Sequence, residues 1–125
     1  MKAAIRFWKF AVLCFGLVAL GCASTSRQHD AFGQFLQTIA ASCQPLIIGT
    51  DNMGQAIMFN GVGATPDDYN NFLGKTESLF RGGISPQIYR ESLGAFLGAG
   101  RYNTASFNCI ISYLPAPAPD QPTAK

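Results

Sequence analysis

The sequence predicts a small all-α domain, a bundle of four or five short helices that is closed by one disulfide. Apolar side chains recur at the spacing of a helical face in several stretches, and two stretches begin with the hydroxyl–proline pair that is typical of helix N-termini. The alternative is an α+β domain with a short hairpin near residues 46–59. The chain has 125 residues, a length that suits one domain and excludes an enzyme with a separate cofactor domain.

The first expected helix of the domain covers residues 30–44. Asp30 is a candidate N-cap, and Pro45 ends the helix because the residue before a proline disfavours the helical conformation. One face of this helix carries an apolar stripe that includes a cysteine, formed by Phe32, Phe35, Leu36, Ile39 and Cys43. The stripe predicts that Cys43 points into the core.

Two further helices are expected over residues 65–81 and 85–99. Thr65-Pro66 and Ser85-Pro86 each combine an N-cap with a proline at the first helical position. Glycines follow both stretches and mark the helix ends. Both stretches carry apolar side chains at helical spacing and are expected to pack by those faces.

For two segments the sequence does not decide between helix and strand. Residues 46–63 suit either two short strands around a turn at residues 52–54 or a short helix from a Thr50 cap to Phe59, and the helical neighbourhood favours the helix. Residues 103–114 suit a helix, although Cys109 then lies off the centre of its apolar face. In a strand, Cys109 would share a side with other apolar residues. We favour the helix.

The N-terminus has the pattern of a secretory signal. Three basic residues in positions 1–9 precede an uncharged run over positions 10–20. That run is too short to cross a bilayer as a helix, which needs about 20 apolar residues. A basic flank, a short apolar core and small residues after it indicate an export signal. The alternative is a buried N-terminal helix, for which this pattern is poor.

Gly21-Cys22 ends the apolar segment and resembles the lipobox of bacterial lipoproteins. The resemblance covers residues 1–22 only. It implies removal of residues 1–21 and attachment of lipid, including palmitate, to Cys22, which would hold the domain at a membrane. Ala23 follows the cysteine where an Asp would retain the protein at the inner membrane, so the resemblance implies the periplasmic face of the outer membrane. A plain signal peptide cut near Ala23 or Ser24 is the alternative.

Removal of the signal changes the charge of the chain. Nine basic and seven acidic residues give +2 for the whole sequence. Six basic side chains remain after residue 21, and the mature side-chain charge is −1. We therefore expect no nucleic-acid partner, because no basic patch remains. The predicted organisation is a polar tether over residues 22–30, a helical domain over residues 31–114 and a tail over residues 115–125 with four prolines, expected to be extended and disordered.

Two cysteines are left for the domain once Cys14 is removed with the signal and Cys22 takes lipid. An even pair in an oxidising compartment predicts a Cys43–Cys109 disulfide. Free thiols or pairing between chains remain the alternative.

The sequence offers no set of catalytic groups, and we expect no enzyme, metal site or cofactor. The single histidine, His29, lies in the tether, so neither a histidine-based triad nor a Cys/His zinc site can form in the domain. Asp67 and Asp68 are neighbours at a helix start and point about 100° apart, so they do not converge as a catalytic pair would. We expect instead that their negative charges interact favourably with the helix dipole.

These features predict a membrane-anchored envelope lipoprotein that acts as a non-catalytic interaction or assembly module, for a secretion complex or another envelope complex. Its size and layout are broadly similar to lipoproteins that pilot secretion-pore subunits. The partners would be the membrane, through Cys22, and an envelope protein that binds in a groove lined by some of the aromatic rings. The alternative is a binder of a small apolar or lipid-like ligand in a helical cavity. Gly33, Gly74 and Gly94 fall inside expected helices, where close helix crossings would justify them.

Overall fold

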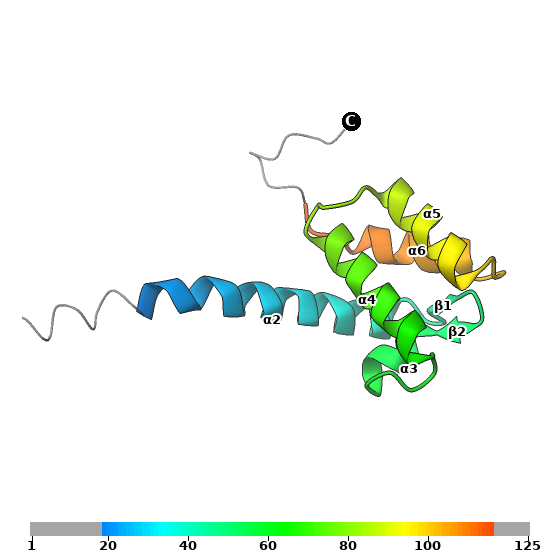
Figure 1. Ribbon diagram of the computed structural model, residues 1–125, viewed down its shortest axis with the longest axis horizontal. Helices are drawn as coiled ribbons and strands as arrows, with labels where there is room; N and C mark the ends of the chain where they lie inside the picture. Colours follow the sequence, from blue (N-terminus) through cyan, green and yellow to red (C-terminus); the bar gives the residue numbers. More distant parts are fainter. Residues whose placement is uncertain (1–18, 117–125) are drawn as a thin grey trace, which may run out of the picture. The chain divides into compact units, whose positions relative to one another are not determined.

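The structure is a computed structural model that describes residues 19–116, with side chains described from residue 29 onward. It separates into one unit that ends at Gly33 and a second that begins at Gln34, and the packing described below lies within the second unit. The elements, in chain order (Figure 1), are α2 (Ala19–Ser42), β1 (Ile47–Ile48), β2 (Asp51–Asn52), α3 (Met53–Met58), α4 (Pro66–Phe80), α5 (Pro86–Leu97) and α6 (Asn103–Ser112).

Helix α2 begins well before the predicted start. Asp30 lies inside the helix and is not its N-cap, and the residues predicted as a tether after Cys22 belong to the same helix. No proline or glycine occurs between residues 22 and 32, so nothing in that stretch interrupts the helical hydrogen bonds. The predicted stripe is confirmed in the second unit, where Phe35, Ile39 and Cys43 are buried. Most of the predicted signal, and the tail from residue 117, lie outside the described residues.

Helices α4 and α5 begin where the hydroxyl–proline pairs predicted. The Thr65 hydroxyl accepts a hydrogen bond from the Asp68 backbone N–H at 3.3 Å, and the Ser85 hydroxyl accepts one from Ile88 at 3.2 Å. Each cap satisfies a backbone donor that the helix itself leaves unpaired. The two helices pack against each other, and their buried hydroxyls meet where Thr76 and Tyr89 are hydrogen-bonded at 2.9 Å.

The segment between α2 and α4 corrects the all-α prediction. Residues 47–48 and 51–52 form a two-stranded antiparallel sheet in which Ile47 pairs with Asn52. The α+β alternative therefore fits better, although its second strand lies earlier than expected. Gly49 allows the tight turn because its φ is +64°.

The helix expected in the same segment also forms, with a different cap. Helix α3 begins at Met53, and the Asn52 side chain accepts a hydrogen bond from the Gln55 backbone N–H at 3.0 Å. Thr50 therefore does not cap it. The strand and helix predictions for residues 46–63 are therefore both partly correct, because this segment contains the hairpin and then helix α3.

Three side chains of helix α6, spaced three residues apart, bond to the segment of residues 43–49, which leads from α2 into the hairpin. Asn103 accepts a hydrogen bond from the Gly49 backbone N–H at 2.7 Å, and Ser106 donates one to the Ile47 carbonyl at 2.8 Å. Cys109 forms a disulfide with Cys43. We call this contact of Asn103, Ser106 and Cys109 with residues 43–49 the α6 seam. The prediction of a helix over residues 103–114 is confirmed, and the strand alternative is wrong.

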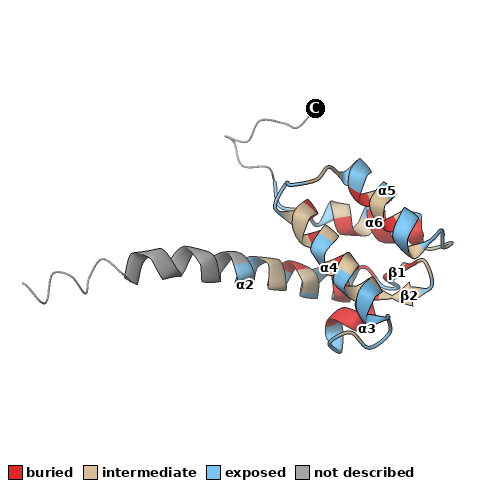
Figure 2. Ribbon diagram, viewed as in Figure 1, coloured by how far each residue is buried: buried red, intermediate tan, exposed pale blue. Residues whose placement is uncertain are grey.

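The core of the second unit takes side chains from the end of α2, the hairpin segment, α3, α4, α5 and α6 (Figure 2). Leu46 and Ile48 from the hairpin are fully buried, as are Phe72, Leu93 and Ile110 from the three helices. A two-stranded hairpin is only marginally stable alone. Here it is stabilised because it buries apolar side chains against helices and shares hydrogen bonds with α6.

Three helical glycines are not explained by internal packing. Beyond the backbone of its own helix, a Cβ atom at Gly33, Gly74 or Gly94 would meet no heavy atom within 4 Å. The expectation of close helix crossings at these positions is therefore wrong. Gly49 and Gly100 are the opposite case. A Cβ atom at Gly49 would collide with the backbone of Leu97, and a Cβ atom at Gly100 would collide with the backbone of Gly49.

The α6 seam predicts a large effect for Asn103→Ala. The substitution leaves the Gly49 N–H and the Gly98 carbonyl, both now bound by the Asn103 side chain, without a partner at a part-buried site. We expect a loss of about 2 kcal/mol in the free energy of unfolding, measured by urea denaturation.

Asn108→Ala is the matched control on the same helix. Asn108 is exposed, and its side chain only accepts a hydrogen bond from Arg90, so we expect a change below about 0.5 kcal/mol. Equal losses in the two variants would contradict the role assigned to Asn103.

Candidate functional site

The predicted site residues are placed as follows. Cys43 and Cys109 are joined, with 66 residues of sequence separation and 5.7 Å between their Cα atoms. Cys22 lies within α2, and its side chain is outside the described set. His29 is exposed on the same helix. Among the residues that the structure describes, no group of three His, Cys, Asp or Glu side chains could hold a metal ion.

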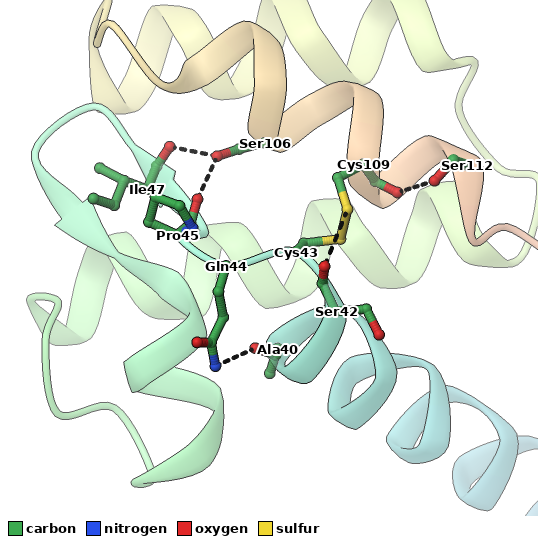
Figure 3. Close-up of a disulfide and its surroundings, with 9 residues drawn as sticks. All are labelled: Ala40, Ser42, Cys43, Gln44, Pro45, Ile47, Ser106, Cys109 and Ser112. Carbon is green, nitrogen blue, oxygen red and sulfur yellow. Dashed lines mark hydrogen bonds between the residues drawn. A yellow bond between two sulfur atoms is a disulfide. The ribbon is translucent and has the colours of Figure 1, made fainter.

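The disulfide lies at one end of the α6 seam (Figure 3). Cys43 is buried and is followed by Gln44 and Pro45, where the chain leaves α2 and turns into the hairpin. The Ser106 hydroxyl reaches the carbonyls of Pro45 and Ile47 from the opposite side. The segment that leads from α2 to the hairpin is therefore held by one covalent bond and by hydrogen bonds.

A groove of about 510 Å³ opens beside this fastened segment. It lies between the end of α2, the following loop and α3. Its lining is mostly apolar, carries three side-chain amides and contains no charged side chain, and consists of Ala40, Gln44, Pro45, Leu46, Asn52, Gly54, Gln55, Met58 and Phe59. Clefts of 300–1,000 Å³ with such linings are typical of binding sites.

The rim of the groove carries large apolar side chains in contact with solvent. Met58 is 45% exposed, and Phe59 is 58% exposed. Their neighbours Ala56 and Ile57 are buried, so the core-facing side of α3 is already occupied by other residues. Exposed apolar side chains that gather at a recess mark interaction sites more often than scattered ones do.

The amides of the groove offer hydrogen bonds at its edge. The side-chain nitrogen of Gln44 donates to the Ala40 carbonyl at 3.4 Å, which is a long bond. The Asn52 side-chain oxygen caps α3. A bound molecule could use the remaining amide groups, while the apolar surface would supply most of the binding free energy.

The floor of the groove depends on a glycine. Gly54 is buried, and a Cβ there would lie 3.2 Å from the Leu46 Cβ. The first turn of α3 can therefore approach the loop after α2 closely. Sequence reasoning expected some aromatic rings to line a groove but did not single out Phe59. The available signal was the run Ala56–Phe59, which has more apolar residues in sequence than one helical face can bury.

A pair of carboxylates lies elsewhere in the second unit. The pKa of Asp51 is raised above 3.8, first by burial and then by a hydrogen bond and charge repulsion from Asp68. Burial likewise raises the pKa of the Tyr89 hydroxyl, which is enclosed with Thr76. Neither group lines the groove.

No protein-family model, curated protein or solved structure matches this chain. Within residues 19–116, no helix is both long enough and apolar enough to cross a membrane.

The disulfide predicts a large stability difference. Replacing Cys43 and Cys109 together by alanine opens a loop of 66 residues, and the chain-entropy relation gives a loss of about 4 kcal/mol in the free energy of unfolding. Cys22→Ala in the same chain serves as the control, with no change expected. An unfolding midpoint that is insensitive to the double substitution would contradict this assignment.

The raised pKa of Asp51 predicts a pH dependence of stability. The folded chain binds a proton at Asp51 more tightly than the unfolded chain does, so this group makes folding less favourable as pH rises from 3.8 through the raised pKa. Asp51→Asn should therefore stabilise the protein more, relative to wild type, at pH 7 than at pH 3.5. Asp67→Asn, which removes a neighbouring carboxylate, is the control. A pH-independent difference for Asp51→Asn, measured by urea denaturation, would refute the prediction.

Proposed function

We propose that this chain is a lipid-anchored, non-catalytic assembly module of a bacterial envelope. In this proposal Cys22 carries lipid and holds the domain at the periplasmic face of the outer membrane, and the groove binds an apolar segment of a protein. The observation that carries the proposal is the groove, because it combines an uncharged apolar lining with exposed apolar residues at its rim.

The rigidity of the groove supports a binding role. One wall follows directly from the disulfide-bonded Cys43, and the other wall is α3, whose start is fixed by the Asn52 cap. A preformed site loses less conformational entropy on binding than a mobile one. The Gly21-Cys22 motif supports the anchoring part of the proposal independently of the groove.

A small apolar or lipid-like ligand is the second candidate. The volume of about 510 Å³ favours it, because this size suits a single ligand. The exposed Met58 and Phe59 favour a protein segment, since apolar side chains at the rim of a recess become fully buried only against a partner that extends beyond the recess.

The proposal predicts site-specific capture of a protein in living cells. A photoreactive side chain at Gln55, which is exposed and lines the groove, should yield a protein adduct in the full-length chain. The same side chain at Gln87, which is exposed on α5, should not. Cys22→Ala should reduce the adduct because the chain would no longer be held at the membrane.

Two outcomes would count against the proposal. Equal adducts at positions 55 and 87 would indicate non-specific contact. An unreacted Gln55 variant, together with a co-purified small molecule detected by native mass spectrometry, would favour the ligand-binding alternative.

A further inference from the structure

The turn that follows α3 contains an Asn-Gly pair at residues 60–61. Asn60 is the only asparagine of the chain that glycine follows, and it is exposed. An asparagine side chain can react with the backbone nitrogen of the next residue, and glycine hinders this approach least because it has no Cβ. The other asparagines lie in α4, α6 or β2, where regular hydrogen bonds restrain the backbone. Sequence and fold therefore both single out Asn60 for this reaction.

Asn60 is the residue at which the chain leaves α3. Its φ is +51°, the left-handed conformation that glycine and asparagine adopt at helix ends. The Gly61 N–H donates to the Ala56 carbonyl at 2.7 Å, which is the hydrogen bond that closes this kind of helix end. The Gly61 nitrogen is the atom that would attack the Asn60 side chain. It is therefore held in a hydrogen bond while the helix end is closed.

The turn beyond this bond is held weakly. The backbone N–H groups of Val62 and Ala64 donate to carbonyls of the same turn at 3.3 and 3.4 Å, which is longer than most N–H···O bonds. Val62 is 58% exposed. A segment with few buried contacts and long hydrogen bonds opens locally at a low cost in free energy. Such opening would free the Gly61 nitrogen while the rest of the domain stays folded.

We propose that Asn60 is a site of spontaneous deamidation, and that its conversion to a carboxylate weakens binding in the groove. In the first step the Gly61 nitrogen loses its proton and bonds to the Asn60 Cγ. The Cγ–Nδ2 bond breaks, and the amide group leaves as ammonia with that proton. Water then adds to the cyclic imide. Breaking the new bond at Cγ gives aspartate, and breaking the bond at the backbone carbonyl of residue 60 gives isoaspartate.

The product places a negative charge beside the groove. Asn60 directly follows Phe59, which lines the groove, and neither residues 52–66 nor the groove lining contain a charged side chain. An apolar occupant would remove water from the new carboxylate, which is unfavourable, and the charge lies at the negative end of the α3 dipole. Isoaspartate also adds a methylene to the main chain, which shifts Gly61 relative to Ala56. This effect on the groove rests on the proposed function.

The chemical step is tested on the purified full-length chain, incubated at pH 7 and at pH 9 and analysed by peptide mass spectrometry. Asn60 should convert to aspartate and isoaspartate, faster at pH 9 because the attacking nitrogen must lose its proton. Unfolding in urea should accelerate the conversion by about tenfold, as the loss of one hydrogen bond gives. Asn70, which is exposed on α4, should stay unchanged in the folded chain.

Three results would overturn the chemical step as described. An unchanged Asn60 in the folded chain, or equal conversion of Asn60 and Asn70, would refute the modification site. Equal rates in the folded and urea-unfolded chain would refute the control by the Gly61–Ala56 hydrogen bond.

The effect on the groove is tested with two variants of the full-length chain in cells. Asn60→Asp carries the charge of the product, and Asn60→Gly is the matched control because both residues tolerate the left-handed conformation. The photoreactive side chain at Gln55 should capture its protein about tenfold less in the Asp variant than in the Gly variant. Thermal unfolding checks that both variants are folded.

The outcomes separate this inference from the proposed function. Equal capture in the two variants would refute the effect on the groove and leave both the modification and the proposed function standing. No capture at Gln55 in any chain would refute the proposed function and the effect on the groove together, and the mass spectrometry of Asn60 would still decide the modification.

Discussion

The α6 seam is the constraint on which the rest of the second unit depends. Asn103, Ser106 and Cys109 lie three residues apart on one helix and bind, in reverse order, to the segment that runs from Cys43 to Gly49. The hairpin that this segment begins has only two residues in each strand, too few to hold a defined shape without external partners. Because α6 supplies those partners, the loop after α2 and the start of α3 have fixed positions. The groove lies between them.

The parts of the fold that were predicted correctly are those specified by neighbouring residues. Thr65-Pro66 and Ser85-Pro86 each place a cap and a proline beside the helix they start, so the information is local. The hairpin depends on Asn103 and Ser106, more than fifty residues away, and no local pattern reports such a partner. Cys109 was judged to lie off the centre of an apolar helix face. That judgement was right, because Cys109 belongs to a second, polar face of α6.

The site was harder to predict than the fold for a related reason. The sequence suggested that some aromatic residues line a groove, and one aromatic residue, Phe59, lines the groove observed. The volume of a groove depends on how closely two segments approach. That approach depends on Gly54 and on Leu46, which look ordinary in the sequence. The Cys43–Cys109 pairing was predictable because the chain offers few cysteines. The pairing of Asp51 with Asp68 was not, because it joins a strand to the start of α4.

The disulfide also determines what proteolysis could do to this molecule. Residues 43–109 form a closed covalent ring that contains the hairpin, α3, α4 and α5. A single backbone cut inside the ring, for example in the turn after α3, would leave the two pieces attached to each other. A cut in α2 before Cys43 would instead separate the whole ring from the N-terminal part of the chain. Shedding of an intact ring and tolerance of internal nicks are therefore both consequences of where the two cysteines lie.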